Sequence, residues 1–207
     1  MAETRQLAVG SRSHSYHSGI ERIQWLTVVW MSVELAVALI AATRAHSVAL
    51  AAFGGDSAIE LLSAAAVLWR LRSNRPHAET TATKITGWLL ITLAAFIAAG
   101  STYTLVSGSQ PRPSYFGIAL LVAAAVVMPW LGRRKRELAA AANTASLRAD
   151  ATQSSICGYM AWIALAGLLL NGFRHFAWAD PVAALGLLPI VLWEAKEALE
   201  GKECCSN

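Results

Sequence analysis

The stretch ITGWLLITLAAFIAAGSTYTLV, residues 85–106, contains no charged side chain. A helix needs roughly 20 predominantly apolar residues to cross the hydrocarbon core of a bilayer, so this stretch is predicted to be a transmembrane helix. The rest of the chain is similar, because 56% of its 207 residues are hydrophobic, only 14% are charged, and its mean hydropathy is +0.46. Ordinary soluble domains carry about 25% charged residues. The composition therefore indicates an integral membrane protein and excludes a soluble enzyme or a nucleic-acid-binding protein.

Five further apolar stretches meet the same length criterion, so the expected fold is an all-α bundle of six transmembrane helices. The spans are expected at residues 24–43, 47–69, 85–106, 114–131, 149–170 and 178–199. Their connections are short, which predicts a single membrane domain over 24–199, with tails at 1–23 and 200–207. No cleavable signal is expected, because residues 1–23 lack an apolar core.

The basic residues predict the orientation of this bundle. All Lys and Arg residues except Arg44, Arg112 and Arg174 fall on one expected side, in or beside the tails and the second and fourth connections. Cytoplasmic loops carry the excess of Lys and Arg in membrane proteins. Both termini are therefore expected in the cytoplasm, and the lack of a transit peptide fits a bacterial inner membrane.

Ionisable side chains inside the spans are the candidate functional residues, because placing them in lipid is costly. Asp56 and Glu60 are four residues apart and so share one face of the second span. No Lys or Arg lies in the middle of a span to neutralise them, so the pair is expected to hold protons or a metal cation. The alternative is a protonated carboxyl bonded to a neighbouring helix. Asp180 precedes Pro181 at the start of the sixth span and is expected to cap that helix.

Gln153 and Cys157 form a second pair, four residues apart on the fifth span. Together with Asp56 and Glu60 they offer four ligands, the number that a tetrahedral divalent metal prefers. A thiolate ligand favours a softer metal such as Zn²⁺ over Mg²⁺ or Ca²⁺. Taken alone, Cys157 is more often a small buried hydrophobic residue, and Gln153 is a weak ligand that more commonly forms hydrogen bonds.

Three short motifs on these spans resemble the cation diffusion facilitator family. Residues 47–60, SVALAAFGGDSAIE, are similar to the family's S-x-A-L segment and its [HD]-S-x-x-D pair. Residues 147–150, LRAD, resemble the segment before the family's H-x-x-x-D pair, and residues 179–185, ADPVAAL, resemble its D-P-x-x-A-L motif. The resemblance covers nearly the whole chain. It implies a six-span, usually homodimeric transporter that exports Zn²⁺ or similar metals against protons.

The resemblance also shows where the chain departs from the family. It assigns Asp56 and Glu60 to the ligand positions of the second span, with Glu in place of Asp. Gln153 and Cys157 fall where the family has His and Asp. The family's cytoplasmic domain after the sixth span has no counterpart in residues 200–207. A tail-less variant with an altered metal site is therefore expected.

Other residues are secondary candidates. Glu34 lies near the middle of the first span and has two interpretations. It is either a metal ligand or proton relay, or a protonated carboxyl group that only packs against its neighbours. Asp150, one turn before Gln153, either passes metal to the site, pairs with Arg148 or caps its helix. The tails contain four side chains that could capture metal: His14, His17, Cys204 and Cys205. The alternative is that both tails are ordinary solvated termini.

The expected function is proton-coupled efflux of Zn²⁺ or a similar ion such as Cd²⁺ by alternating access, because metal ligands must lose their protons to bind. The expected partners are the metal, protons, membrane lipid and a second copy of the chain, with no resident cofactor and no nucleic acid. The alternatives are a non-transporting membrane subunit or metal sensor that keeps the fold, and a small-molecule exporter. An enzyme is not expected, because the spans contain no nucleophile–base arrangement.

Overall fold

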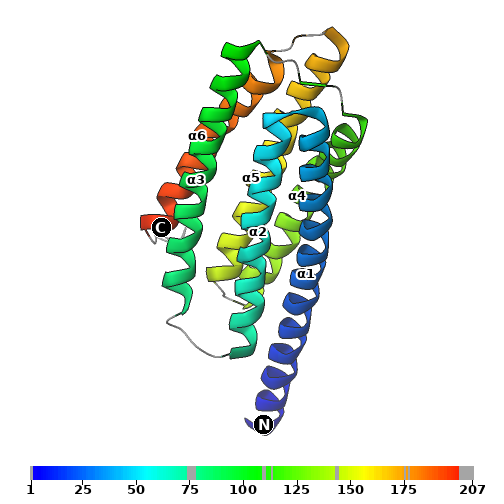
Figure 1. Ribbon diagram of the computed structural model, residues 1–207. Coiled ribbons are helices and arrows are strands. Elements are labelled where there is room, and N and C mark those ends of the chain that lie inside the picture. The colour runs from blue at the N-terminus through cyan, green and yellow to red at the C-terminus, as the bar shows by residue number, and fades with distance from the viewer. Residues whose placement is uncertain are drawn as a thin grey trace.

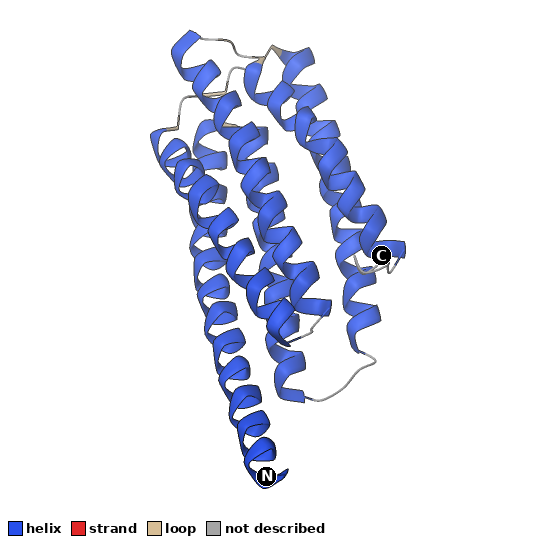
Figure 2. Ribbon diagram, turned by 180° about the vertical axis from the view of Figure 1, so that it is seen from behind, coloured by secondary structure: helices blue, strands red, loops and turns tan. Residues whose placement is uncertain are grey.

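The protein is a bundle of helices, and no strand occurs in the part of the chain that the structure describes (Figures 1 and 2). The computed structural model describes residues 2–73, 78–108, 111–112, 114–142, 145–174, 176 and 178–200. The helices are α1 (Ala2–Ala45), α2 (Val48–Ser73), α3 (Ala78–Ser107), α4 (Tyr115–Ala142), α5 (Ala145–Arg174) and α6 (Ala179–Glu200). The prediction of an all-α protein is therefore confirmed.

Five of the helices, α1 to α5, contain stretches long and apolar enough to cross a membrane. Helix α6 does not meet that composition criterion, and its second half carries Glu194, Lys196 and Glu197. The structure thus supports a membrane protein with several spanning helices, while a sixth crossing remains a prediction.

The exposed and buried faces of α1 are those of a helix in lipid. Its exposed side chains include Trp25, Val29 and Val33, each about half exposed or more, whereas Gln24 and Glu34 are fully buried. A helix in water places its polar side chains outside and its apolar ones inside. The reversal indicates that the exposed face of α1 lies against hydrocarbon.

The helices pack as three close pairs, α1 with α2, α4 with α5, and α3 with α6. Helix α3 lies beside α6 at one edge of the bundle in both ribbon views (Figures 1 and 2). Helices α4 and α5 approach closely at Gly132, where an added Cβ would lie 2.5 Å from Ser155 Oγ and 3.0 Å from the Ala151 carbonyl oxygen. Glycine is therefore required there for the two backbones to meet.

The end of the bundle that holds the α1–α2, α3–α4 and α5–α6 connections is tied together by polar contacts. The backbone N–H of Arg112 donates to the Ala45 carbonyl at 2.7 Å, and the Asn171 amide donates to the Pro111 carbonyl at 2.8 Å. These bonds join α1, the connection before α4, and α5. We call this region the connection end.

Asp180 makes a further tie at the connection end. Its carboxylate accepts from Ser47 Oγ at 2.5 Å and from the backbone N–H groups of Val48 and Ala49 at 3.0 and 3.4 Å. The expectation that Asp180 caps its own helix is wrong, because α6 begins at Ala179 and the carboxylate satisfies the first turn of α2 instead. An acidic side chain at a helix N-terminus is stabilising whichever helix supplies it.

Candidate functional site

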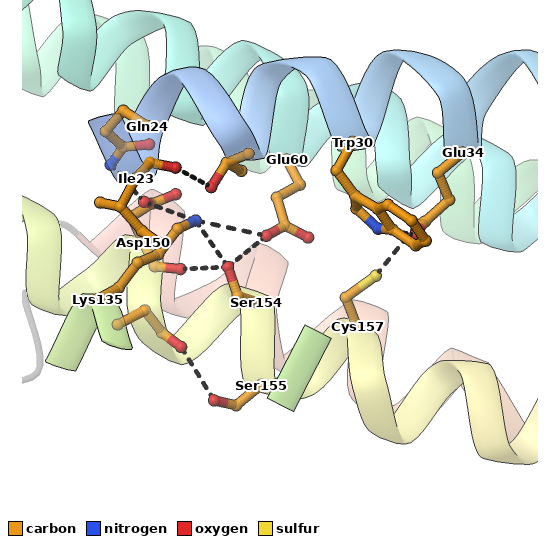
Figure 3. A network of polar contacts seen from close by, with 12 residues as sticks. Ile23, Gln24, Trp30, Glu34, Glu60, Lys135, Asp150, Ser154, Ser155 and Cys157 are labelled. Carbon is orange, nitrogen blue, oxygen red and sulfur yellow. Dashed lines mark hydrogen bonds and ion pairs between the residues drawn. The ribbon is translucent and has the colours of Figure 1, made fainter. Parts of the chain in front are cut away.

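A buried ion pair links α4 to α5 inside the bundle. The Lys135 Nζ lies 2.9 Å from Oδ2 of Asp150, and both side chains are completely excluded from solvent. The same carboxylate oxygen accepts a hydrogen bond from the Gln24 amide of α1 at 2.7 Å. Figure 3 shows how these groups meet. Two donors therefore share one oxygen of Asp150.

Lys135 also connects this pair to Glu60 on α2. The Nζ atom lies 3.8 Å from Glu60 Oε1 and donates to Ser154 Oγ at 2.8 Å. The Ser154 hydroxyl in turn donates to the same Glu60 oxygen at 2.5 Å. We call Gln24, Glu60, Lys135, Asp150 and Ser154 the lysine network. It joins four helices, α1, α2, α4 and α5 (Figure 3).

A second group of contacts surrounds Glu34 on α1. The Trp30 indole N–H donates to Glu34 Oε2 at 2.6 Å, and the Ser57 hydroxyl donates to Oε1 at 2.8 Å. The Cys157 thiol lies 3.8 Å from the same Oε1 atom (Figure 3). Glu34 is completely buried, so these donors replace the water that its carboxyl group would otherwise bind.

Asp56 and Glu194 complete the acidic interior. Asp56 interacts electrostatically with Glu34 and Glu60, and Glu194 on α6 interacts with Asp56 and Glu60. One oxygen each of Asp56, Glu60 and Glu194 is buried without a hydrogen-bond partner: Oδ1, Oε2 and Oε2 respectively. Lys135 is the only buried Lys or Arg among the residues whose side chains are described. Carboxyl groups therefore outnumber cations in this region.

Three of the four predicted metal ligands lie in the buried interior. Asp56, Glu60 and Cys157 are all buried, and Cys157 lies close enough to both carboxyl groups to interact with them. Gln153 is only half-buried, and its amide makes no hydrogen bond to another described residue. Within the described ranges, no three His, Cys, Asp or Glu side chains stand close enough to hold a metal ion together.

The two secondary candidates inside the bundle, Glu34 and Asp150, have different neighbours. Glu34 lies beside Cys157, whereas Asp150 pairs with Lys135 about one turn from Gln153. Cys204 and Cys205 lie outside the described residues, as do the side chains of His14 and His17, whose backbone belongs to α1.

Two buried charged side chains of this region, Lys135 and Glu194, were not predicted as candidates from the sequence. The expectation that no cation lies near the carboxylates is wrong, because α4 continues to Ala142 and carries Lys135 into the interior. Glu194 was not among the predicted candidates, although it lies within the sixth expected span, at residues 178–199. Both lie on the buried face of their helix, which the 3.6-residue period could have revealed.

No protein-family model matches this chain, and no curated protein matches it significantly.

Proposed function

We propose that the protein exports a divalent transition-metal cation, Zn²⁺ or Cd²⁺, in exchange for protons, as cation diffusion facilitators do. The observation that carries this proposal is the excess of buried carboxyl groups, Glu34, Asp56, Glu60 and Glu194, over Lys135, the single buried cation among the described side chains. Isolated carboxylates are too costly to bury in a low-dielectric interior, so such groups take up protons or bind cations. A site that alternates between the two couples metal to proton movement.

The neighbouring donors are consistent with such an exchange. The hydroxyls of Ser57 and Ser154 bond to Glu34 and Glu60, and a hydroxyl can turn to accept from a protonated carboxyl or donate to an ionised one. The thiol of Cys157 adds a donor suited to a soft metal. Binding a metal would require these carboxyl groups to turn toward one ion, since each now holds its own hydrogen bonds.

The proposed topology follows from the Lys and Arg distribution described above. Both termini are assigned to the cytoplasm of a bacterial inner membrane, and the connection end then faces outward. The assembly is proposed to be a homodimer.

The test is uptake of Zn²⁺ and Cd²⁺ into proteoliposomes with an imposed proton gradient. Wild type is compared with Asp56→Ala, Glu60→Ala and Cys157→Ser, and with Glu137→Ala as a matched control, since that carboxylate is exposed. We expect the first two variants to lose uptake, Cys157→Ser to change the Zn²⁺/Cd²⁺ ratio, and the control to keep wild-type rates. Full uptake by both carboxylate variants would remove this site from consideration.

A second candidate function is a metal sensor or non-transporting membrane subunit that keeps the fold. The observation in its favour is that an ammonium group already sits 3.8 Å from Glu60 and that the described residues contain no group of three His, Cys, Asp or Glu side chains able to hold a metal ion. Metal binding by the wild-type protein without any uptake would support this alternative. Uptake that depends on the proton gradient would exclude it.

A further inference from the structure

Lys135 reaches the acidic interior from α4, and three other helices face its ammonium group. Glu60 approaches it from α2, Asp150 and Ser154 from α5, and Gln24 from α1. The other ionisable groups of this region are Glu34, Asp56, Cys157 and Glu194. The ammonium group of Lys135 is thus held by its own chain beside a candidate cation ligand.

The two carboxylates are not equivalent partners of this ammonium. Asp150 Oδ2 lies 2.9 Å from Nζ and also accepts from Gln24, whereas Glu60 Oε1 lies 3.8 Å away and is bridged by Ser154. Losing Glu60 would leave Lys135 with Asp150 and Ser154. Each carboxyl group has one further oxygen, Glu60 Oε2 and Asp150 Oδ1, that is buried without a partner, so the two groups differ in the contacts of the other oxygen. Glu60 is therefore the carboxylate that can be released from Lys135 at least cost.

We propose that Lys135 acts as a tethered cation, occupying the Glu60 carboxylate until a cation of higher charge displaces it. Replacing an ammonium by Na⁺ or K⁺ exchanges one unit charge for another and also immobilises a free ion, so nothing is gained. A divalent ion doubles the Coulomb attraction to the same carboxylate. Lys135 would thus set the minimum charge of the cargo. The identity of the transported ion in this inference rests on the proposed function. The experiment that tests the inference, however, is carried out on the metal-free protein.

The experiment measures thermal unfolding of the detergent-solubilised protein at alkaline pH, in NaCl and in choline chloride of equal ionic strength. Lys135→Met removes the charge but keeps an unbranched side chain, and Lys135→Arg is the matched control that keeps the charge. We expect Na⁺ to raise the unfolding temperature of Lys135→Met by roughly 2–4 °C and to leave wild type and Lys135→Arg unchanged. Adding Glu60→Gln to Lys135→Met should abolish the Na⁺ effect.

Lys135→Met leaves Asp150 buried without its counter-charge, so Lys135→Met/Asp150→Asn serves as a second variant that removes both charges and keeps Glu60. It should show the same Na⁺ effect. The proposal would be overturned if either of these two variants folded well but its unfolding temperature did not rise in Na⁺. A Na⁺ effect that survives Glu60→Gln would also overturn it.

Zn²⁺ binding to the same proteins separates this inference from the proposed function. If the protein handles divalent metals, Lys135→Met should bind Zn²⁺ roughly tenfold more tightly or better, since a like charge 3.8 Å from the ligand oxygen is gone. If Zn²⁺ binds neither wild type nor any variant, while Na⁺ stabilises only Lys135→Met and Lys135→Met/Asp150→Asn, the metal-export function fails and the tethered cation stands. Equal Zn²⁺ affinity of wild type and Lys135→Met would count against the tethered cation.

Discussion

Lys135 and Asp150 form an ion pair 2.9 Å long in which neither side chain is accessible to solvent. Removing one partner of a buried pair leaves an uncompensated charge, which costs about 3–5 kcal/mol, whereas replacing both partners by neutral groups costs much less. We expect Asp150→Asn to destabilise the protein by about that amount. The double variant with Lys135→Met should be more stable than the sum of the single changes predicts. Chemical unfolding in detergent gives the free energy of unfolding of wild type, both single variants and the double variant. If the changes in this free energy were additive, the pair would not be energetically coupled.

The cap that Asp180 provides for α2 predicts a local effect far away in the sequence. Asp180→Ala removes the acceptor for the N–H groups of Val48 and Ala49, and loss of a helix cap costs about 0.5–2 kcal/mol. Amide hydrogen exchange should therefore rise in the first turn of α2, although the substitution lies in α6. Ser47→Ala removes the hydroxyl that donates to Asp180 and accepts from the Leu50 N–H, so it should raise exchange at Leu50 while Val48 and Ala49 keep their acceptor. Faster exchange confined to α6 would contradict this account.

Glu194 belongs to the acidic interior although it lies on α6. Because it interacts with Asp56 and Glu60, Glu194→Gln should lower proton-driven metal uptake roughly tenfold or more, as changes beside metal ligands commonly do. Glu200→Gln is the matched control on the same helix, since that carboxylate is exposed. Equal uptake by both variants would exclude Glu194 from the site.

The close approach of α4 and α5 makes Gly132 sensitive to a single methyl group. Gly132→Ala would push Cβ against Ser155 and the Ala151 carbonyl oxygen, and overpacking of this kind costs about 1–3 kcal/mol. Gly186→Ala is the control, because its nearest atom would be Ile163 Cγ2 at an ordinary 3.7 Å. That change should be neutral, or stabilising by up to about 1 kcal/mol, since Ala favours helix more than Gly does. Equal losses of stability in thermal unfolding would show that packing at Gly132 is not special.

Hydropathy predicted the number of helices well, because lipid requires long apolar stretches and this chain has little else. It predicted the helix ends poorly. Helix α1 starts at Ala2 and α4 runs to Ala142, well beyond the apolar stretches at 24–43 and 114–131. Hydropathy reports which part of a helix contacts hydrocarbon, whereas backbone hydrogen bonding continues through polar residues as well.

The run Arg133 to Arg136 shows why Lys135 was missed. Four consecutive basic residues suggest a solvated connection, and Arg133, Arg134 and Arg136 are indeed exposed. Lys135, however, continues the buried face of α4 through Met128, Leu131 and Ala139. These positions follow one another at intervals of three or four residues, so helical phase, and not charge alone, decides which member of the run enters the interior.

The angular position of a residue around the helix axis also explains why Gln153 is only half-buried. Four residues advance an α-helix by more than one full turn, so Gln153 and Cys157 do not point in quite the same direction. The buried line of α5 runs through Asp150, Ser154 and Cys157, and this leaves Gln153 at its edge. Which side chain bonds to which carboxylate depends on how the neighbouring helices are rotated about their own axes. A single sequence does not specify that rotation.

The contact between Asp180 and the start of α2 gives the bundle a pivot. It holds the first turn of α6 against a neighbouring helix, whereas Glu194 lies fourteen residues further along, about 21 Å away at 1.5 Å per residue. When α6 tilts about this contact together with its close partner α3, displacement grows in proportion to distance from the fulcrum. A tilt of α6 too small to disturb Asp180 would therefore still carry the Glu194 carboxyl group toward or away from Asp56 and Glu60.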